Sequence, residues 1–365
     1  MVSMIDPRTV LPPQLDADQV AALAAAHHHW WTKALPVHVA GHGQASTTMP
    51  GPGEVQVHPL GSGESFRAWS VVRGGDPALE LVVKVPTRPI AQLTHPLGAE
   101  LAVLAHVPEG LSAASIGSHE PTAEEPLAFV VTTRVPGRRL PAADWNDDLV
   151  AALTRQLARL HVHGGADATA LAAVGDPVRD AEQALAWWRT NEPDAARTLE
   201  ELWPAVLRHQ ESARSAFDHA ERLLVHGDAS AANVLVDEQG VPRLVDWEWS
   251  HRGDPARDLA FIGGQIHAEP WYVQLDERQI EHQVDVYVEA RAELGEPLSS
   301  PAGGGVPDAA QLRTAMLRRR AAHLLHEVFF TSAHFHRVAA AGGEEAEFYA
   351  DTAAGVQQQI RDWLT

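Results

Sequence analysis

The sequence contains no cysteine, which excludes disulfide bonds, cysteine-ligated zinc and catalysis by a thiolate. It also has no run that approaches the roughly 18 uninterrupted apolar residues of a membrane helix. The first residues, Met-Val-Ser-Met-Ile-Asp-Pro, lack the basic, apolar and small-residue regions of a secretory signal. These absences fit a cytoplasmic protein, which is the location that we expect.

Lysine is nearly absent as well. Of 28 basic residues only Lys33 and Lys84 are lysines, so the other 26 are arginines. Lys84 lies in the apolar strand run Leu81–Val85, where charge is normally avoided. A compact ammonium that reaches phosphate oxygens is one reason to keep a lysine there, because a guanidinium is bulkier and its fork is rigid. The alternative is an edge-strand lysine whose head reaches solvent.

Overall charge and length limit the possible partners and the architecture. The net charge of −20 disfavours nucleic acid and anionic membranes as partners, and it weakly favours a cationic small substrate. The 365 residues, 45% of them hydrophobic, suit a soluble globular protein of two domains or one bilobed domain. Nothing in the sequence decides between a monomer and a homodimer.

The most informative segment runs from His226 to Asp246. It contains His226-Gly227-Asp228, then Asn233, and Asp246 thirteen residues later. Short apolar runs, Val234–Val236 and Arg243–Val245, flank a polar turn, so the segment reads as a loop that leads into a hairpin. Phosphoryl transfer needs such a set, because one carboxylate accepts a hydroxyl proton while oxygen ligands hold magnesium. The alternative is an ordinary turn with solvated acids and one capping asparagine.

These residues resemble the aminoglycoside phosphotransferase and choline kinase family, whose members have His-Gly-Asp where protein kinases have His-Arg-Asp. Asp246-Trp247-Glu248 and the segment Gly253–Ala260 are also similar to that family. The resemblance is dense from about Val55 to Gln265, thin afterwards and absent before about Pro50.

The resemblance implies an α+β, bilobal, protein-kinase-like fold. A small N-terminal β-sheet lobe with one helix (residues 51–134) would bind nucleotide phosphates, and a larger, mainly helical lobe (residues 135–365) would carry catalysis and acceptor binding. Residues 1–50 would be an N-terminal extension, with Ala40–Pro52 as a linker or lid-like loop.

The same resemblance assigns roles in the larger lobe. Asp228 would orient or deprotonate the acceptor hydroxyl, with His226 supporting the catalytic loop. Asn233 and Asp246 would bind Mg²⁺, and Asp258 would organise the loop from the start of a helix. The nucleotide would be ATP or GTP.

In the smaller lobe, a strand–loop–strand pattern surrounds Gly61-Ser62-Gly63-Glu64-Ser65. Gly61, Ser62, Gly63 and Ser65 would cover the phosphates, although Gly-Ser-Gly is also ordinary hairpin chemistry. Lys84 would bind phosphate while paired with Glu100 on the next helix, unless that acid simply faces solvent.

By alignment to the family, the carbonyl of Thr133 and the amide of Val135 would bind the adenine edge at the interlobe hinge.

Periodicity predicts further helices. They are Asp16–Leu35, Pro96–His106, Asp147–His163, Ala181–Thr190, Trp203–Ala220, Glu277–Glu293 and Asp308–Arg337, with a polar loop at Gly295–Gly305.

Several other features have an ordinary structural explanation. His27-His28-His29 invites a metal site, but adjacent helical residues point about 100° apart and cannot all face one ion. The aromatic pairs Trp187-Trp188, Trp271-Tyr272 and Phe329-Phe330 are more often core than acceptor pocket. Glu269 and Asp276 would suit an acidic acceptor wall or be solvated loop acids.

The leading functional hypothesis is a nucleotide- and Mg²⁺-dependent phosphotransferase that acts on a hydroxyl of an aminoglycoside, macrolide or nucleoside antibiotic. A metabolic kinase for choline, a sugar or an amino alcohol is the second. A non-catalytic nucleotide-binding module is the third, and the presence of all five expected active-site residues speaks against it. Trp247-Glu248 in place of Phe-Gly, and the lack of a downstream Ala-Pro-Glu, disfavour a protein acceptor.

Overall fold

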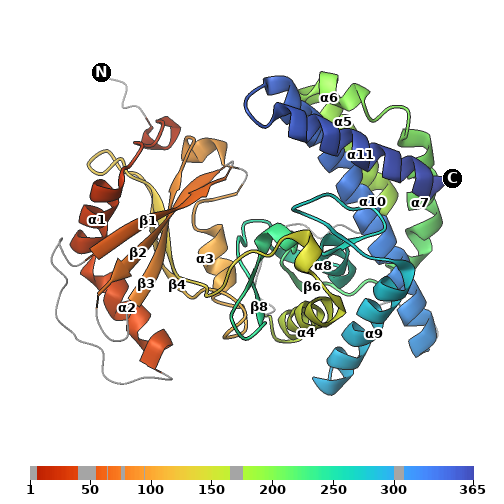
Figure 1. The fold of residues 1–365 in the computed structure, drawn as a ribbon, viewed down its shortest axis with the longest axis horizontal. Helices are drawn as coiled ribbons and strands as arrows, with labels where there is room; N and C mark the ends of the chain where they lie inside the picture. The colour runs from red at the N-terminus through yellow and green to blue at the C-terminus, as the bar shows by residue number, and fades with distance from the viewer. Residues whose placement is uncertain are drawn as a thin grey trace. The chain divides into compact units, whose positions relative to one another are not determined.

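The computed structural model describes residues 6–39, 55–63, 65–74, 79–93, 95–164, 176–299 and 308–365, without the side chains of residues 35–39 and 219. The chain divides into two compact units, Met1–Pro136 and Gly137–Thr365 (Figure 1). The whole predicted loop Ala40–Pro52 lies outside the described residues, as do Glu64 and part of the predicted loop Gly295–Gly305.

The N-terminal unit is built on an antiparallel sheet with the strand order β1-β2-β3-β5-β4. Its helices and strands are α1 (Ala17–Ala26), α2 (His28–Val39), β1 (Val55–Ser62), β2 (Phe66–Arg73), β3 (Leu79–Pro86), α3 (Ala99–Leu104), β4 (Ser115–His119) and β5 (Phe129–Thr133).

Strand β3 shows how the two faces of this sheet are used. Leu79, Leu81, Val83 and Val85 alternate along the strand and are buried, as the period of two in a β-strand requires. They pack in a core with side chains of α1 and α2, whereas a smaller cluster on β5 and the residues around α3 forms separately. Lys84 lies on the face opposite Val83, and its side chain reaches Glu100 of α3.

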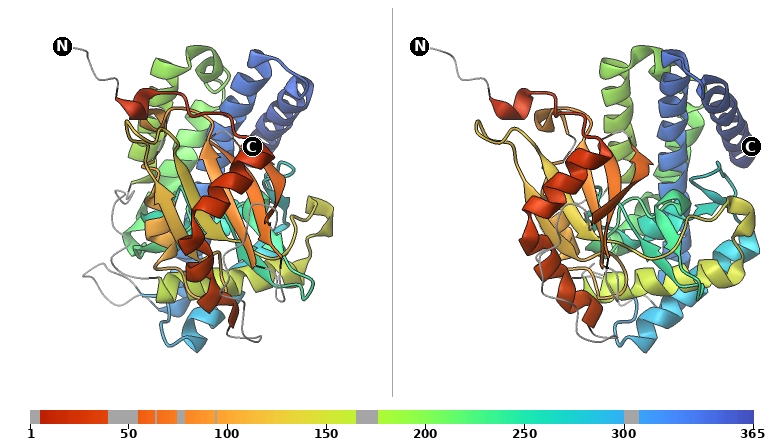
Figure 2. Two further views of the ribbon diagram at one scale, coloured as in Figure 1. Left: turned by 90° about the vertical axis from the view of Figure 1, so that its left-hand side faces the viewer. Right: turned by 60° about the vertical axis from the view of Figure 1, so that its left-hand side comes forward.

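The N-terminal helices belong to the core of this unit. Asp16 accepts a hydrogen bond from the backbone N–H of Gln19, whose side chain bonds back to Asp16 in a capping box. The single helix predicted for Asp16–Leu35 is divided at His27, whose Nδ1 donates to Leu23 O at 2.8 Å and whose ring stacks on Trp30. Trp30 and Trp31 are buried against the sheet, so this segment covers one of its faces (Figures 1 and 2).

The C-terminal unit is mainly helical and carries short strand pairs. Its elements are α4 (Asp147–His163), α5 (Pro177–Asn191), α6 (Pro193–Arg197), α7 (Trp203–Ala213), β6 (Leu223–Val225), β7 (Val234–Val236), β8 (Pro242–Leu244), β9 (His251–Gly253), α8 (Pro255–Phe261), β10 (Gly263–Gly264), β11 (Val273–Gln274), α9 (Glu277–Glu293), α10 (Ala309–Ala341) and α11 (Ala346–Leu364).

The predictions for the helices are confirmed to different degrees. The predicted bounds of α4 and α9 agree with the structure, and the stripe Leu149, Leu153, Leu157, Leu160 is buried. The helix predicted for Trp203–Ala220 was too long, because α7 ends at Ala213 and a 3₁₀ helix, Arg214–His219, follows. The helix predicted for Pro96–His106 was also too long, since α3 spans only Ala99–Leu104.

Helices α10 and α11 form a hairpin that closes the unit at the C-terminus. They lie side by side in both views of Figure 2, and Gly342 and Gly343 occupy positive φ at the connection. Buried side chains of both helices share one core with α5, α6 and α7. Helices α6 and α11 were not predicted from the sequence.

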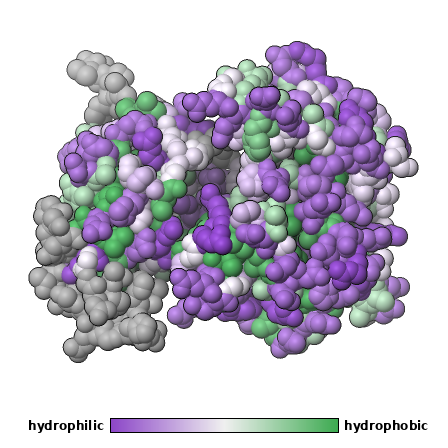
Figure 3. All heavy atoms as spheres, in the orientation of Figure 1, coloured by the Kyte–Doolittle hydropathy of each residue, from purple (hydrophilic) through white to green (hydrophobic). Residues whose placement is uncertain are grey.

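The surface of the C-terminal unit is mostly hydrophilic on the face that Figure 3 shows, and the apolar side chains lie beneath it. Among the described residues, no helix combines the length and the apolarity needed to cross a membrane.

Replacing Trp31 by alanine should lower the free energy of unfolding by about 3–5 kcal/mol, because the fully buried side chain leaves a cavity between α2 and the sheet. The matched control is Trp187→Ala on α5, whose side chain is 54% exposed and whose loss should change stability by no more than about 0.5 kcal/mol. Urea denaturation of both variants checks this, and equal effects would show that the N-terminal helices do not stabilise the unit.

Candidate active site

The loop His226–Asn233 is held at both ends by strand pairs. It starts directly after β6, which pairs antiparallel with β9, and it ends where β7 begins the hairpin with β8. The backbone N–H of Val245, just after β8, donates to Asn233 O at 2.9 Å. The short strands therefore position the start of the loop, its end and the approach to Asp246.

The buried carboxylate of Asp258 anchors the first residues of the loop. The backbone N–H of His226 donates to Asp258 Oδ2 at 2.8 Å, and that of Gly227 donates to Oδ1 at 2.9 Å. His161 on α4 donates from Nε2 to Oδ2 at 3.0 Å. Burial would raise the pKa of Asp258, but the hydrogen bond and charge of His161, together with the backbone N–H of Gly227, hold that pKa below its usual value. The expected contact between Asp258 and the catalytic loop is confirmed.

The ring of His226 completes the support of the loop from within. Its Nε2 donates to Val245 O at 3.1 Å, so Nδ1 is the acceptor for the backbone N–H of Asp228 at 3.3 Å. The ring is buried and meets the indole of Trp247 edge to face. These contacts connect the start of the loop to the segment that carries Asp246.

Gly227 is required by its surroundings. Its φ is +83°, and a Cβ at this position would lie 2.2 Å from Trp249 O. Any other residue would add a clash with the backbone to an unfavourable conformation. The central position of the His-Gly-Asp motif therefore has a steric explanation in this chain.

Asp228 and Asn233 are brought together across the loop. The Nδ2 group of Asn233 donates to Asp228 Oδ2 at 2.7 Å and to Asp228 O at 3.0 Å. Because Nδ2 is used in this way, Oδ1 is the atom that the amide can offer to a cation. Burial raises the pKa of Asp228 to about 8, and the negative charges of Glu327 and Asp246 contribute in the same direction.

Asp246 adopts a strained backbone conformation. Its φ is +68°, which no other non-glycine residue shares in the part of the chain that the structure describes. Such a conformation costs of order 1–2 kcal/mol and persists only where the surrounding structure enforces it. The negative charge of Asp246 contributes to the raised pKa of Asp228.

Glu327 and Arg257 were missed by the sequence analysis. Glu327 on α10 accepts hydrogen bonds at Oε1 from the hydroxyls of Tyr272, at 3.2 Å, and Thr331, at 3.0 Å. Arg257 on α8 lies 3.7 Å from Glu327 Oε2 and donates from Nε to Gly227 O at 3.2 Å. Arg257 lies within the recognisable Gly253–Ala260 segment, so a signal existed for it, whereas nothing near Glu327 in the sequence marks that residue.

In the N-terminal unit, the structure contains the predicted pair of Lys84 and Glu100. Lys84 Nζ lies 2.9 Å from both carboxylate oxygens of Glu100, and the two side chains are only 16% and 10% exposed. Such a symmetric contact fixes the ammonium in place. A role for Lys84 in binding phosphate stays a prediction.

The predicted phosphate loop is a tight turn between β1 and β2. Gly61 and Ser62 are the last residues of β1, next to an irregularity in the pairing with β2. The backbone N–H of Gly63 donates to Phe66 O at 2.8 Å, and Thr87 N–H donates to Ser65 O at 2.9 Å. This geometry suits a hairpin turn as well as a phosphate-covering loop, so both interpretations stay open.

Thr133 is the last residue of β5, and Val135 follows the strand, just before the boundary of the N-terminal unit at Pro136. Thr133 Oγ1 accepts from the backbone N–H of Ala114 at 2.8 Å, and Arg134 N–H donates to Glu80 O at 3.0 Å. These bonds fix the strand end, and the proposed contact with adenine stays a prediction.

The remaining candidates are mostly structural. Asp276 caps α9 in a capping box with Gln279. The side chains of Tyr272, Phe329 and Phe330 are buried in the core of the C-terminal unit, and Trp188 and Trp271 pack against that core.

A family model described as the phosphotransferase enzyme family matches residues 56–296. The match includes Lys84, Glu100 and the whole segment from His226 to Asp258. The chain belongs to this family.

Relatives of known identity support the same grouping. Viomycin phosphotransferase from Streptomyces vinaceus is 34% identical over 169 residues, which are 42% of this chain and 55% of that protein. The match thus spans about half the length of this relative.

Two solved structures share the fold. Choline kinase from Cryptosporidium parvum Iowa II has a TM-score of 0.59 and 11% identity, with 94% of this chain and 95% of that chain covered. A thermostable mutant of an aminoglycoside phosphotransferase, in a ternary complex with ADP and hygromycin B, has a TM-score of 0.50 and 17% identity, with 85% and 95% covered. The kinase-like, bilobal α+β fold expected from the motifs is confirmed.

The acidic groups of this candidate site fit a magnesium ion. A carboxylate at Asp246 and the amide oxygen of Asn233 are the hard oxygen ligands that Mg²⁺ prefers. Glu327 and Asp246 both repel the carboxylate of Asp228 and so contribute to its raised pKa. A divalent cation beside Asp246 would relieve that repulsion.

Gly227→Ala should reduce the stability of the protein by more than about 2 kcal/mol and displace Asp228, because the new methyl group meets Trp249 O. Gly240→Ala is the matched control: its φ is +77°, yet a Cβ there has no atom within 4 Å. The control should cost only the conformational term of about 1–2 kcal/mol. Denaturant unfolding of the two variants measures the difference, and equal losses would contradict the steric explanation.

Proposed function

We propose that this protein transfers the γ-phosphate of ATP or GTP, with Mg²⁺, to a hydroxyl group of a small-molecule antibiotic. The observation that carries the proposal is the Asp228–Asn233 pair on a loop anchored by Asp258. It supplies a fixed, half-buried carboxylate beside an amide oxygen, and Asp246 adds a second carboxylate, which is the donor set that phosphoryl transfer uses.

In the proposed reaction, the acceptor hydroxyl donates a hydrogen bond to the carboxylate of Asp228. The acceptor oxygen forms a bond to the γ-phosphorus, the bond from that phosphorus to the bridging oxygen breaks, and the nucleoside diphosphate leaves. The proton of the hydroxyl passes to Asp228, whose raised pKa suits a base. Asn233 Nδ2 holds Oδ2 in place, so the orientation of the base is set before the acceptor binds.

Other residues would hold the nucleotide. Lys84, kept in place by Glu100, would bind phosphate oxygens, and the backbone of Gly61–Ser65 would cover them. Asn233 and Asp246 would hold Mg²⁺, which when bound neutralises phosphate charge. Thr133 and Val135 would meet the adenine or guanine edge.

An antibiotic acceptor is favoured over choline by the relatives. The 34% identity to viomycin phosphotransferase is a likeness of sequence, whereas the 11% identity to choline kinase shows a common fold alone. The hygromycin B complex shows that an antibiotic occupies a protein of this fold.

Nucleotide-consumption assays test the acceptor class. They compare peptide, aminoglycoside, macrolide and nucleoside antibiotics with choline and ethanolamine. Mass spectrometry of the product identifies the added phosphoryl group. Turnover with choline or ethanolamine alone would reject the antibiotic assignment.

Asp228→Ala should lower the rate of transfer by about 10²–10⁴-fold, the range expected for loss of a general base, while nucleotide binding persists. Glu238→Gln, an exposed change in the β7–β8 turn, should leave the rate unchanged. Turnover assays and nucleotide titrations by calorimetry measure the two effects. A near-normal rate for Asp228→Ala would show that another group is the base.

Lys84→Arg should raise the KM for nucleotide roughly tenfold, because the larger, rigid guanidinium cannot keep the symmetric contact with Glu100 and reach phosphate as an ammonium does. The chain offers its other lysine as the control. Lys33 Nζ donates to Ile116 O at 2.6 Å, and Lys33→Arg should leave the KM unchanged. Similar KM values for the two variants would contradict a role for Lys84 in binding phosphate.

A further inference from the structure

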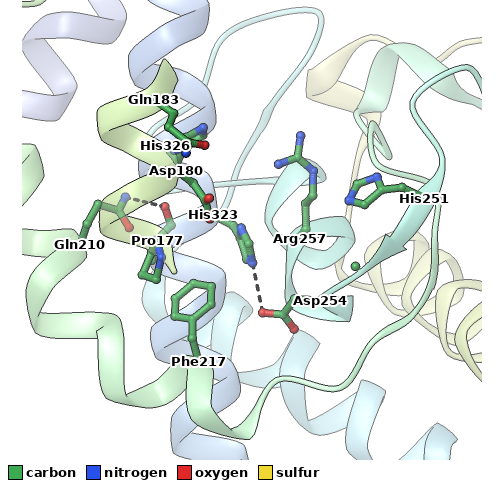
Figure 4. Close-up of a pocket in the computed structure, with 12 residues that line it drawn as sticks. Pro177, Asp180, Gln183, Gln210, Phe217, His251, Asp254, Arg257, His323 and His326 are labelled. Carbon is green, nitrogen blue, oxygen red and sulfur yellow. Dashed lines mark hydrogen bonds and ion pairs between the residues drawn. The ribbon is translucent and has the colours of Figure 1, made fainter. Parts of the chain in front are cut away.

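A cavity of about 220 Å³ lies within the C-terminal unit, and the function proposed above does not use it (Figure 4). Its walls come from α5, α7, the 3₁₀ helix after α7, the segment from β9 into α8, and α10. This volume is far larger than a single water molecule needs. The cavity can therefore hold a group of several heavy atoms.

Two hydrogen-bond acceptors in this wall have no partner among the described residues. They are Asp180 Oδ2 on α5 and Gln210 Oε1 on α7. Gln210 is only 1% exposed, and its Nε2 donates to Ala322 O at 3.0 Å, which fixes the amide and leaves Oε1 as its unpaired atom. A buried acceptor without a donor costs about 1–3 kcal/mol, so such atoms are rare unless a ligand or water satisfies them.

The other charged groups in the wall already have partners. Asp254 accepts from Arg319 at 2.9 Å and from His323 at 3.1 Å. Arg257 donates to Gly227 O and lies 3.7 Å from Glu327. Burial lowers the pKa of His326 to about 3, so this ring is neutral and adds no positive charge. The unsatisfied chemistry of the cavity is thus that of acceptors.

The negative charge of Asp180 also favours a hydrogen-bond donor as the ligand of this cavity. Burial raises the pKa of Asp180 to about 6, so at pH 7.5 the carboxylate is still mostly ionised. A half-buried carboxylate without a hydrogen-bond donor on Oδ2 favours a cation that carries N–H groups.

We propose that this cavity binds a protonated nitrogen group, an ammonium or a guanidinium, through Asp180 Oδ2 and Gln210 Oε1, and that this group belongs to the phosphoryl acceptor. The assignment of the group to the acceptor rests on the proposed function. The cation site itself rests on the cavity and its two unpaired acceptors alone.

Arg257 connects the cavity to the catalytic loop. Its side chain is part of the cavity wall, and its Nε donates to Gly227 O at 3.2 Å, one residue before Asp228. His251, also in the wall, lies beside Gly227, since a Cβ there would be 3.2 Å from His251 Nδ1. A basic arm in the cavity would therefore lie next to the loop that carries the base, while a hydroxyl elsewhere on the same molecule reacts.

Calorimetric titration of the full chain with agmatine, which carries a guanidinium and an ammonium, tests the cation site. Asp180→Asn should weaken agmatine binding at least tenfold. The matched control is Glu182→Gln, which removes the same charge from an exposed position on the same helix and should change affinity less than twofold. Methylguanidine should compete with agmatine, and methylurea, its neutral analogue, should not.

A thermal unfolding scan separates binding from folding. Because burial disfavours the charged carboxylate of Asp180 more than its neighbours favour it, Asp180→Asn should melt at the wild-type temperature or above it. A lower melting temperature would indicate a structural carboxylate and overturn the proposal. Equal agmatine affinity in Asp180→Asn and Glu182→Gln, or competition by methylurea as strong as by methylguanidine, would overturn it as well.

A separate measurement tests whether the bound cationic group belongs to the phosphoryl acceptor. With an antibiotic that is turned over, Asp180→Asn should raise the acceptor KM at least tenfold and leave the nucleotide KM unchanged. An unchanged acceptor KM would overturn the assignment while the proposed function stands. If agmatine binds through Asp180 but no hydroxyl acceptor is ever phosphorylated, the proposed function fails and the cation site stands.

Discussion

Two backbone N–H groups that point at one buried carboxylate set the shape of the active-site loop. Asp258 accepts from His226 and Gly227 at the same time, and His161 holds the carboxylate from the other side. Without Asp258, both N–H groups would be buried without a partner, and that arrangement is rarely tolerated. The chain turns at Gly227, where a side chain would meet Trp249 O, and Asp228 follows directly.

The proposed site contains negative charges that are kept close together. Glu327 and Asp246 both raise the pKa of Asp228 by their negative charge, and the φ of +68° at Asp246 adds backbone strain. Neither feature helps folding, because like charges repel and the strain has a cost. Both are understandable where a cation and a phosphoryl group are to be bound. Arg257 partly offsets the repulsion, since it lies beside Glu327 and holds Gly227 O.

The sequence predicts the parts whose signal is local. The His226–Asp246 segment has fixed spacing, and α4 and α9 have clear periodicity, so their predicted bounds agree with the structure. The Lys84–Glu100 pair follows from a strand–helix order. Other parts depend on tertiary contacts. The surface on which α1 and α2 pack could not be predicted, because an Ala-rich helix suits many surfaces. The influence of Glu327 on Asp228 could not be predicted either, because the two residues lie far apart in the sequence.

The most direct test is a crystal structure with Mg²⁺ and a non-hydrolysable ATP analogue. The proposed site predicts a divalent ion coordinated by Asn233 Oδ1 and a carboxylate oxygen of Asp246, with Asn233 Nδ2 still bonded to Asp228. A nucleotide bound with its metal away from these two residues, or an Asp228 carboxylate that coordinates the ion in place of Asp246, would contradict the assignment.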